Sequence, residues 1–273
     1  MNPLDILQRT PKTNCGECGH PTCLAFAAAV SRAGLEISLC PYIDLTGLEI
    51  NVISSTKDLE NLAEEVATEH DLSLVRHLRE KVSQLNFGAI ASALGAKWHK
   101  YNPETLRLRY LGQDVVLSKK EILINNDTVA DPRDQILLYN YVFSEGGRQP
   151  DNNWVGMESL PNSISKVKTL GIYCEKRIAE HLSGKPGHIL KDIGQQFDGY
   201  EGPAELSSSA TSSLVVPVLP MVPQFLLFWE EEPEDGFAAK AKVLFDHHVL
   251  DFLDLESLVF SAERFAERLV LFL

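Results

Sequence analysis

Four of the chain's five cysteines lie within the first 40 residues, and their spacing constrains the fold more than any other feature. The spacing is Cys15-x2-Cys18-x4-Cys23-x16-Cys40. Glu17 is the one charged residue among the first three cysteines, and the glycines beside it let backbone amides approach sulfur. The segment has too few large apolar residues to build a core of its own. The spacing therefore predicts a loop wrapped around a metal.

The fourth cysteine is expected to return to the other three. An alanine-rich run from Thr22 to Ala33 predicts a helix about 18 Å long that ends at Gly34. If Leu35 to Cys40 is extended, it covers about 20 Å and brings Cys40 back beside Cys23. The sulfurs would then gather at a helix N-terminus, where the macrodipole and free amides favour negative charge.

Three interpretations of the thiols are open. A [4Fe–4S] cluster fits four thiolates with this spacing, and Pro41 follows the last cysteine as a proline does in some ferredoxin runs. Structural zinc usually uses two short knuckles, and only one CxxC pair is present. Disulfides or free thiols would suit a secreted protein, but residues 1–6 include Pro3 and Asp5 and no apolar signal segment follows. The spacing favours the [4Fe–4S] cluster.

Residues 14–41 resemble a known iron–sulfur domain. It is the small four-cysteine [4Fe–4S] domain at the start of the corrinoid iron–sulfur protein large subunit and in the B subunit of Rnf-type electron-transport complexes. The resemblance rests on all the cysteine spacings and on the run Cys-Gly-x-Cys-Gly-x-Pro-Thr-Cys with an alanine-rich helix behind it. It implies that Cys15, Cys18, Cys23 and Cys40 ligate the cluster and that the cluster transfers one electron. We expect neither whole protein, because further ferredoxin cysteine runs and a membrane anchor are missing, and a barrel alone takes about 250 residues.

Residues 95–273 resemble a second family, an uncharacterised domain that often follows this cluster segment in anaerobic bacteria and archaea. The resemblance implies how the two domains are paired and leaves the chemistry open. It rests on four stretches: Leu137 to Tyr141, Leu219 to Pro223, the strand through Trp229, and Ala238 to Asp246.

The pattern of apolar residues predicts the remaining elements. A capping signal at Ser55 and apolar residues at helical steps up to Leu85 predict one long or two short helices over 56–85. Later segments predict strands and helices that segregate instead of alternating as βαβ units, which favours an α+β fold. Strands are predicted at 105–110, 115–117, 122–124, 215–216, 225–229 and 239–244, and helices at 131–145, within 164–197 and after 246. We predict three parts: a helical cluster domain over 1–50, a helical connector over 51–86, and an α+β body over 87–273.

Composition limits the partners. The net charge of −13 disfavours nucleic acid, and it accommodates a basic protein or a small ligand more easily. The longest apolar run, Leu214 to Trp229, is too short for a membrane span and contains prolines. We therefore expect a cytoplasmic protein with a redox partner protein or a small-molecule cofactor, no nucleic acid and no membrane span.

Other residues able to carry chemistry give weaker signals. Cys174 is spaced with Ile178 and Leu182 on an apolar helix face, which is typical of a core residue. The pair His247 and His248, next to Asp246, could touch a metal, but adjacent side chains point to different faces, so we expect a solvated pair. His20 is expected to shield the cluster, and the acidic run 230–235 to form a solvated hairpin tip.

The sequence thus predicts an iron–sulfur protein that binds one [4Fe–4S] cluster and transfers one electron to a partner or a bound cofactor. One alternative is an enzyme whose body binds a corrinoid or another small molecule and is fed electrons by the cluster. Another is a purely structural cluster or zinc site. No catalytic residue can be named, and the chain could be an oxidoreductase or a redox carrier.

Overall fold

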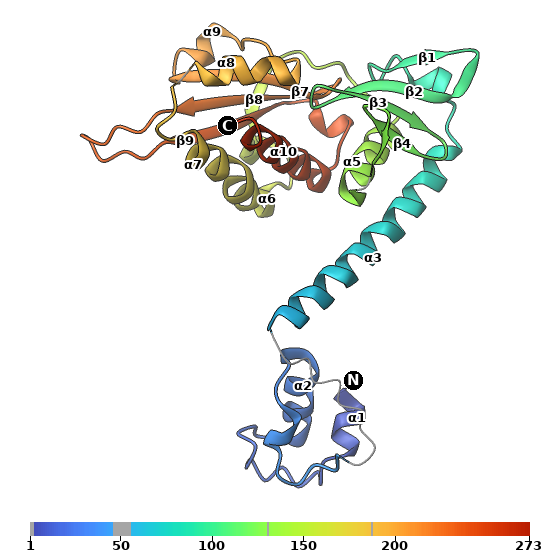
Figure 1. The fold of residues 1–273 in the computed structure, drawn as a ribbon, viewed down its shortest axis with the longest axis vertical. Coiled ribbons are helices and arrows are strands. Elements are labelled where there is room, and N and C mark those ends of the chain that lie inside the picture. Colours follow the sequence, from blue (N-terminus) through green and yellow to red (C-terminus); the bar gives the residue numbers. More distant parts are fainter. Residues whose placement is uncertain (1–2, 46–55, 130, 187) are drawn as a thin grey trace. The chain divides into compact units, whose positions relative to one another are not determined.

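The computed structural model describes residues 3–45, 56–129, 131–186 and 188–273. The chain divides into two compact units, Met1–Asn61 and Leu62–Leu273. We call them the N-terminal unit and the body, and Figure 1 colours both along the sequence. Helices and two antiparallel sheets make the protein an α+β protein, as the sequence predicts. The boundaries between the three predicted parts stay predictions.

The N-terminal unit is built on two helices that pack together, α1 (Pro3–Gln8) and α2 (Cys23–Ala33). Ile6 of α1 and Phe26 of α2 are fully buried. The Thr22 hydroxyl accepts a hydrogen bond from the amide of Ala25 and so caps α2 at its N-terminus. Gly34, at φ 63°, ends α2 in the left-handed conformation. The predicted helix over 22–33 and its glycine stop are confirmed.

One long helix, α3 (Thr56–Ser83), covers most of the predicted connector. Val75, Leu78 and Val82 of α3 are buried in the core of the body. The predicted capping residue Ser55 lies outside the described residues. Of the two predicted alternatives over 56–85, one long helix or two short ones, the structure confirms the single long helix.

The first sheet of the body is a meander of five antiparallel strands in sequence order. Its strands are β1 (Lys97–His99), β2 (Asn102–Tyr110), β3 (Gln113–Ser118), β4 (Ile122–Ile124) and β5 (Asp127–Thr128). Leu111 and Gly112, both at positive φ, form a two-residue hairpin between β2 and β3. A Cβ at Gly112 would lie 2.0 Å from the Gln196 carbonyl oxygen, so this turn requires glycine. The helices α4 (Phe87–Ile90) and α5 (Pro132–Phe143) precede and follow this sheet.

The second sheet has the strand order β6-β9-β8-β7, and every pair is antiparallel. Its strands are β6 (Trp154–Gly156), β7 (Ser212–Leu219), β8 (Val222–Trp229) and β9 (Lys240–Asp246). All residues of β8 before Trp229 are buried. The prediction of a central strand at 225–229 is confirmed, because an apolar run without alternation suits a strand buried on both faces.

Helices cover the second sheet. In Figure 1, α10 (Leu255–Val270) lies beside α6 (Ile164–Leu170) and α7 (Arg177–Leu182), which pack against it. A π-helical segment, Gly171–Lys176, joins α6 to α7, and α8 (Ile189–Gly194) packs against β7. The remaining elements are the short helix α9 (Ala204–Ser207) and the 3-10 turns Ile37–Leu39, Met157–Ser159, Gln195–Phe197 and Val249–Asp251.

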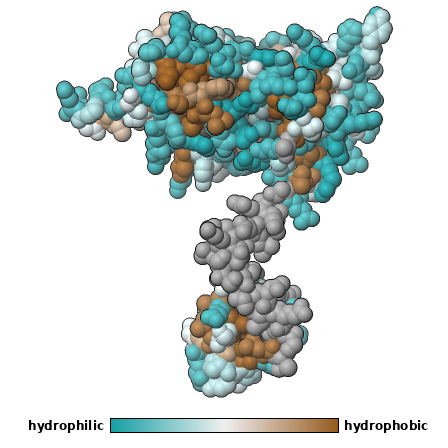
Figure 2. Space-filling model, in the orientation of Figure 1, coloured by the Kyte–Doolittle hydropathy of each residue, from teal (hydrophilic) through white to brown (hydrophobic). Residues whose placement is uncertain are grey.

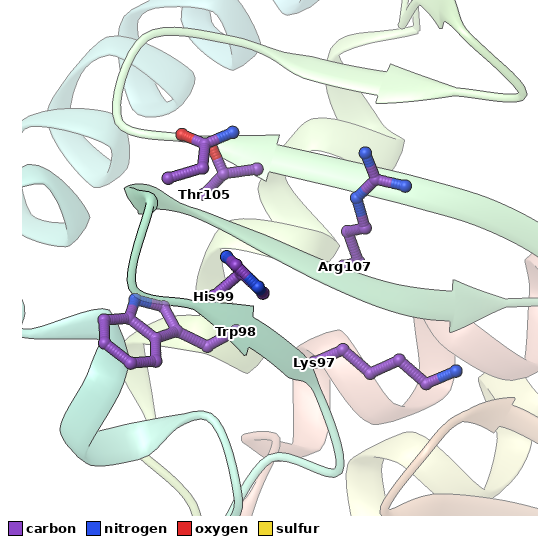
Figure 3. Close-up of a pocket in the computed structure, with 6 residues that line it drawn as sticks. Lys97, Trp98, His99, Thr105 and Arg107 are labelled. Carbon is purple, nitrogen blue, oxygen red and sulfur yellow. The ribbon is translucent and has the colours of Figure 1, made fainter.

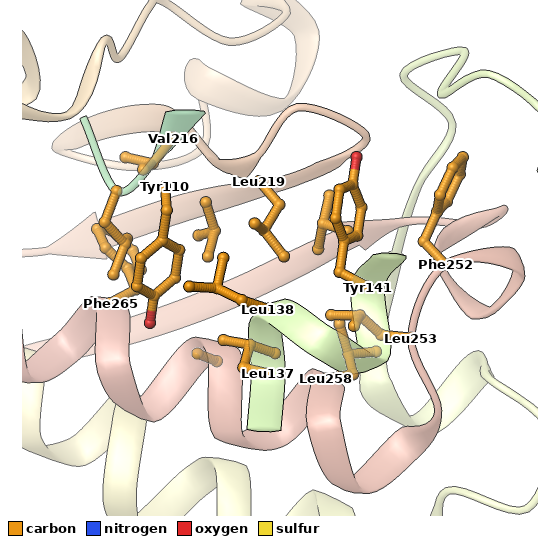
Figure 4. Packing of buried hydrophobic residues seen from close by; sticks show 14 of the residues in the cluster. Tyr110, Leu137, Leu138, Tyr141, Val216, Leu219, Phe252, Leu253, Leu258 and Phe265 are labelled. Carbon is orange, nitrogen blue, oxygen red and sulfur yellow. The ribbon is translucent and has the colours of Figure 1, made fainter. Parts of the chain in front are cut away.

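A single large core joins the two sheets of the body. Figure 4 shows Tyr110 of β2, Leu138 of α5, Leu219 of β7 and Phe265 of α10 gathered in it. The amide of Leu111 also donates to the carbonyl of Val218, which ties the first sheet to the second. No helix within the described ranges combines the length and the apolar character that a bilayer-spanning segment needs.

Candidate metal centre

The four N-terminal cysteines occupy different environments in the N-terminal unit. Cys15 is exposed and Cys18 is half-buried, and both lie in the loop between α1 and α2. Cys23 is the first residue of α2 and is 6% exposed. Cys40, 5% exposed, follows the 3-10 turn Ile37–Leu39. All four thiols are free, and their assignment as ligands stays a prediction.

The loop that carries Cys15 and Cys18 depends on residues at positive φ. Asn14, Gly16 and Gly19 have φ values of 53°, 76° and 81°. The amide of Gly19 donates to the carbonyl of Gly16 at 2.9 Å, which closes a tight turn around Cys18. Since only glycine and a few polar residues adopt this conformation readily, the Cys-Gly-x-Cys-Gly pattern encodes the turn.

Hydrogen-bond donors converge on the sulfur of Cys23. They lower the pKa of this thiol, chiefly through the backbone N–H of Asn14, with help from the Thr10 hydroxyl and the amides of Lys12 and Thr13, while burial opposes them. The Asn14 side-chain oxygen in turn accepts the amide of Cys23 at 2.9 Å. Cys23 also stands at the positive end of α2. The chain is therefore built to stabilise a thiolate at this position.

The route from α2 to Cys40 differs from the expected extended return. Ile37–Leu39 forms a 3-10 turn, so the expectation of an extended segment over 35–40 is wrong. The turn shortens the path, and hydrogen bonds Leu39 N to Glu36 O and Cys40 N to Ile37 O satisfy backbone groups that an extended segment would leave unpaired.

Tyr42 links the fourth cysteine to the first loop. Its hydroxyl donates to Glu17 Oε2 at 2.9 Å. The pKa of Tyr42 is raised chiefly by this hydrogen bond, then by the charge of Glu17 and by burial, with smaller contributions from Cys15 and Cys40. Tyr42 therefore lies within electrostatic range of both ends of the cysteine motif.

Among the described residues, no three of the four N-terminal cysteine sulfurs lie within 4.8 Å of one another. A tetrahedral zinc site with Zn–S bonds of about 2.3 Å holds its sulfurs about 3.8 Å apart. Among the residues that the structure describes, the one group with three ligand atoms within 4.8 Å of one another is Asp151, His247 and His248. The four thiols thus do not form a preassembled site for one ion.

Two weaker sequence candidates behave as expected. Cys174 is fully buried in the π-helical segment, and burial raises the pKa of its thiol well above the ordinary value, so the prediction of a core cysteine is confirmed. In the acidic run, Glu230, Glu232 and Glu234 are not buried, while Glu231 accepts the amide of Gly184 at 2.7 Å. His20 packs its ring on Phe26 at 5.9 Å, and its predicted shielding role stays a prediction.

The histidine pair lies at a strand end, as predicted, directly after β9, but His247 and His248 are only partly exposed and not fully solvated. Their side chains are 33% and 15% exposed, and their rings lie 3.6 Å apart beside Asp151. Asp151 is distant in the sequence, and no local pattern could have linked it to the histidines. It arrives through the antiparallel pairing of β6 with β9, which sets Trp154 opposite Asp246.

Sequence reasoning also missed a hollow on the first sheet, which Figure 3 shows in close-up. It has a volume of about 630 Å³. Lys97 and Arg107 give it a basic character, His99 also lines it, and Trp98 forms one side. The remaining lining residues are Asn102 and Thr105. The pairing of β1 with β2 at the edge of the sheet brings these side chains together. In the sequence, the alternation of residues along β2 was the one sign that they could share a face.

The chain belongs to the family described as "Domain of unknown function (DUF3786)", whose model matches residues 86–268. A second family model, described as "Putative Fe-S cluster", matches residues 11–42, which include all four N-terminal cysteines. The protein therefore pairs an iron–sulfur cluster domain with a DUF3786 domain, and both resemblances seen in the sequence are confirmed.

Three curated relatives match parts of this chain that differ in length. The corrinoid/iron-sulfur protein large subunit of Moorella thermoacetica is 50% identical over 43 residues, 16% of this chain and 10% of that protein. The gamma subunit of the acetyl-CoA decarbonylase/synthase complex of Methanosarcina acetivorans is 28% identical over 148 residues, 52% of this chain and 25% of that protein. The B subunit of the ion-translocating oxidoreductase complex of Vibrio atlanticus is 36% identical over 70 residues, 22% of this chain and 34% of that protein.

The chain thus spans between a tenth and about a third of the length of these relatives. No solved structure matches it.

Proposed function

We propose that this protein is a redox protein in which Cys15, Cys18, Cys23 and Cys40 hold one [4Fe–4S] cluster. The observation that carries the proposal is the set of donors around Cys23, which lowers the pKa of a thiol at a helix N-terminus. Thiolates are the form that ligates metals, and the same amides would hydrogen-bond a negatively charged cluster. When bound, such a cluster supplies one-electron transfer.

The residues around the cysteines have separate tasks in this proposal. Gly16 and Gly19 turn the loop so that Cys15 and Cys18 can ligate from the exposed side. Cys23 and Cys40 would ligate from the buried side, against the packed helices. Four cysteine ligands complete the usual set for this cluster, so no further side chain is required as a ligand.

An exposed edge would let the cluster exchange electrons with a protein partner. Cys15, Gly16 and Gly19 are exposed, so little protein would separate a partner from that edge. The N-terminal unit also exposes hydrophobic residues, among them Leu24 and Leu39. Figure 2 shows brown, hydrophobic surface on this unit. The relatives are named as subunits of complexes, which supports a protein partner here. We place the protein in the cytoplasm, and its net charge of −13 argues against nucleic acid as the partner.

A second candidate function is that of a cluster-fed enzyme, in which the body binds a small reducible molecule. The hollow lined by Lys97, Trp98, His99 and Arg107 favours it, because cationic side chains beside an aromatic ring suit an anionic ligand with a flat ring system. A corrinoid or another reducible cofactor that stays bound to the anaerobically purified body would support this second candidate over a simple carrier.

Metal analysis of full-length protein purified without oxygen tests the proposal. We expect about four iron and four sulfide per chain, with visible charge-transfer absorbance. Cys18→Ser should lose most of the iron, whereas Cys174→Ala, which removes the fifth thiol from the body, should keep it. Stoichiometric zinc without iron would refute the cluster and favour a structural zinc site. Unchanged iron in Cys18→Ser would refute the ligand assignment.

A further inference from the structure

Three side chains that could ligate a metal meet beside the start of β6 and the end of β9. Asp151 precedes β6, and His247 and His248 follow β9 directly. One ligand atom from each residue lies within 4.8 Å of the other two. His247 Nδ1 is 3.3 Å from Asp151 Oδ1, and His248 Nε2 is 3.9 Å from Asp151 Oδ2.

The buried carboxylate of Asp246 holds the backbone on both sides of this group. Asp246 is fully buried, and its Oδ2 accepts the amides of Asp151 and Asn152 at 2.9 and 2.8 Å. Its Oδ1 accepts the amide of His248 at 3.0 Å. The amide of His247 donates to the Asn153 carbonyl at 3.0 Å and so extends the β6–β9 pairing past the strand ends. The backbones of both ligand segments are therefore held in place before any metal arrives.

The histidine nitrogens are withheld from other partners. His247 Nδ1 and His248 Nδ1 are both buried, and neither makes a hydrogen bond with any part of the chain that the structure describes. Buried polar atoms are nearly always paired, so the unpaired Nδ1 of His247, the nitrogen that faces Asp151, indicates that something else satisfies it, while His248 faces Asp151 with its Nε2. Asp151 does not satisfy His247 Nδ1, because the 3.3 Å contact between them lacks hydrogen-bond geometry.

No basic side chain among the described residues competes with a cation for the carboxylates of this corner. Within the described residues, Asp151 and Asp246 form ion-pair contacts with the two histidines only, and no Lys or Arg lies within 4.0 Å of either carboxylate. The nearby Arg148 is instead held by Asp251, with Nε 2.7 Å from Oδ2.

We propose that Asp151, His247 and His248 bind a divalent transition-metal ion such as Zn²⁺ or Fe²⁺. Two imidazoles and one carboxylate are a ligand set that such ions prefer, and harder ions such as Mg²⁺ and Ca²⁺ favour oxygen ligands alone. Three protein ligands leave at least one position for water or a substrate, as in catalytic and not in structural zinc sites. The site therefore gives the body its own place for metal chemistry, separate from the four N-terminal cysteines.

The movement needed to close the site is small. Tetrahedral bonds of about 2.0–2.2 Å place ligand atoms about 3.4 Å from one another. Asp151 carries the most exposed of the three side chains, at 55%, and can rotate toward the histidines. Its Oδ1 accepts the amide of Asn153 at 3.0 Å, which holds the loop beside the histidines.

Equilibrium dialysis against ZnCl₂ tests the site, with zinc and iron counted in the same sample of full-length, cluster-loaded protein. We expect one zinc per chain beyond the unchanged iron. His248→Gln and Asp151→Asn should each weaken zinc binding by at least about a hundredfold, since even residues behind the ligands cost 10- to 100-fold. His181→Gln, at an exposed histidine elsewhere in the body, should bind as the wild type does.

Asp151→Asn keeps an oxygen for the Asn153 amide, so it tests the ligand without removing that hydrogen bond. Thermal unfolding shows whether each variant is folded. Absence of the additional zinc in the wild type would overturn the proposal, and so would undiminished zinc in folded Asp151→Asn and His248→Gln. Neither result bears on the cluster, whose iron is measured separately.

Discussion

Phe26 lies in the core of the N-terminal unit. We expect its replacement by alanine to weaken both the fold of this unit and its retention of the cluster. Its side chain is fully buried with Ile6 and Ala27, and its ring contacts His20 at 5.9 Å. Phe→Ala substitutions in cores cost about 3–5 kcal/mol because they remove transfer energy and leave a cavity. A unit of this size has a core worth only about 3–5 kcal/mol, so Phe26→Ala should consume most of the stability that packing provides.

The consequence can be measured as a rate of iron loss. If a chelator reaches the cluster through local opening of the unit, a loss of about 3 kcal/mol raises the open population, and with it the rate, about a hundredfold. Iron release to a chelator and amide exchange of the segment around α1 and α2 should both accelerate. Leu24→Ala is the matched control, because Leu24 lies on the same helix but is 52% exposed. Wild-type rates of iron release and exchange in Phe26→Ala would refute the reasoning.

Three further predictions concern the body and the cluster loop. Arg264 donates to both oxygens of Asp134 at 2.9 and 2.6 Å. Arg264→Met removes this partner from a buried carboxylate, so it should lower the free energy of unfolding in urea by about 3–5 kcal/mol. A loss below about 1 kcal/mol would contradict this prediction. Arg148 lowers the pKa of Asp251 from 3.8 to about 2, so this pair stabilises the fold above about pH 4 and the contribution fades as the pH falls toward 2. Because Arg148 is 67% exposed, the ion pair contributes only about 1 kcal/mol to stability. Asp251→Asn should therefore reduce the change of thermal-unfolding temperature with pH between about pH 4 and 2. An unchanged pH dependence in this variant would count against the prediction. Glu17→Trp, in the exposed loop, should slow electron exchange in stopped flow without loss of iron, and an unchanged rate would argue against that edge as the route.

Local patterns predicted most of the elements because their signals are short in range. Thr22 and Gly34 mark the ends of α2 through capping and a left-handed residue, which act within a few positions. Strand alternation located β2 and the apolar run located β8 for the same reason. The candidate cysteines are also close in sequence, so their spacing alone pointed to a metal.

What the sequence could not predict depends on contacts between distant segments. An exception is the 3-10 turn before Cys40, which local backbone hydrogen bonds close and which the cysteine spacing does not predict. The grouping of Asp151 with His247 and His248 requires the register of β6 on β9. Adjacent histidines on a strand would point apart, but these follow the strand end, where a turn brings their rings together.

The central claim is that four cysteines hold one [4Fe–4S] cluster that carries a single electron. Electron paramagnetic resonance of anaerobically purified, dithionite-reduced protein tests it most directly, with spin counted against chain concentration. We predict an iron–sulfur signal of about one spin per chain that vanishes on reoxidation and is absent from Cys23→Ser. A protein that stays silent after reduction at low potential, or a full signal in Cys23→Ser, would contradict it.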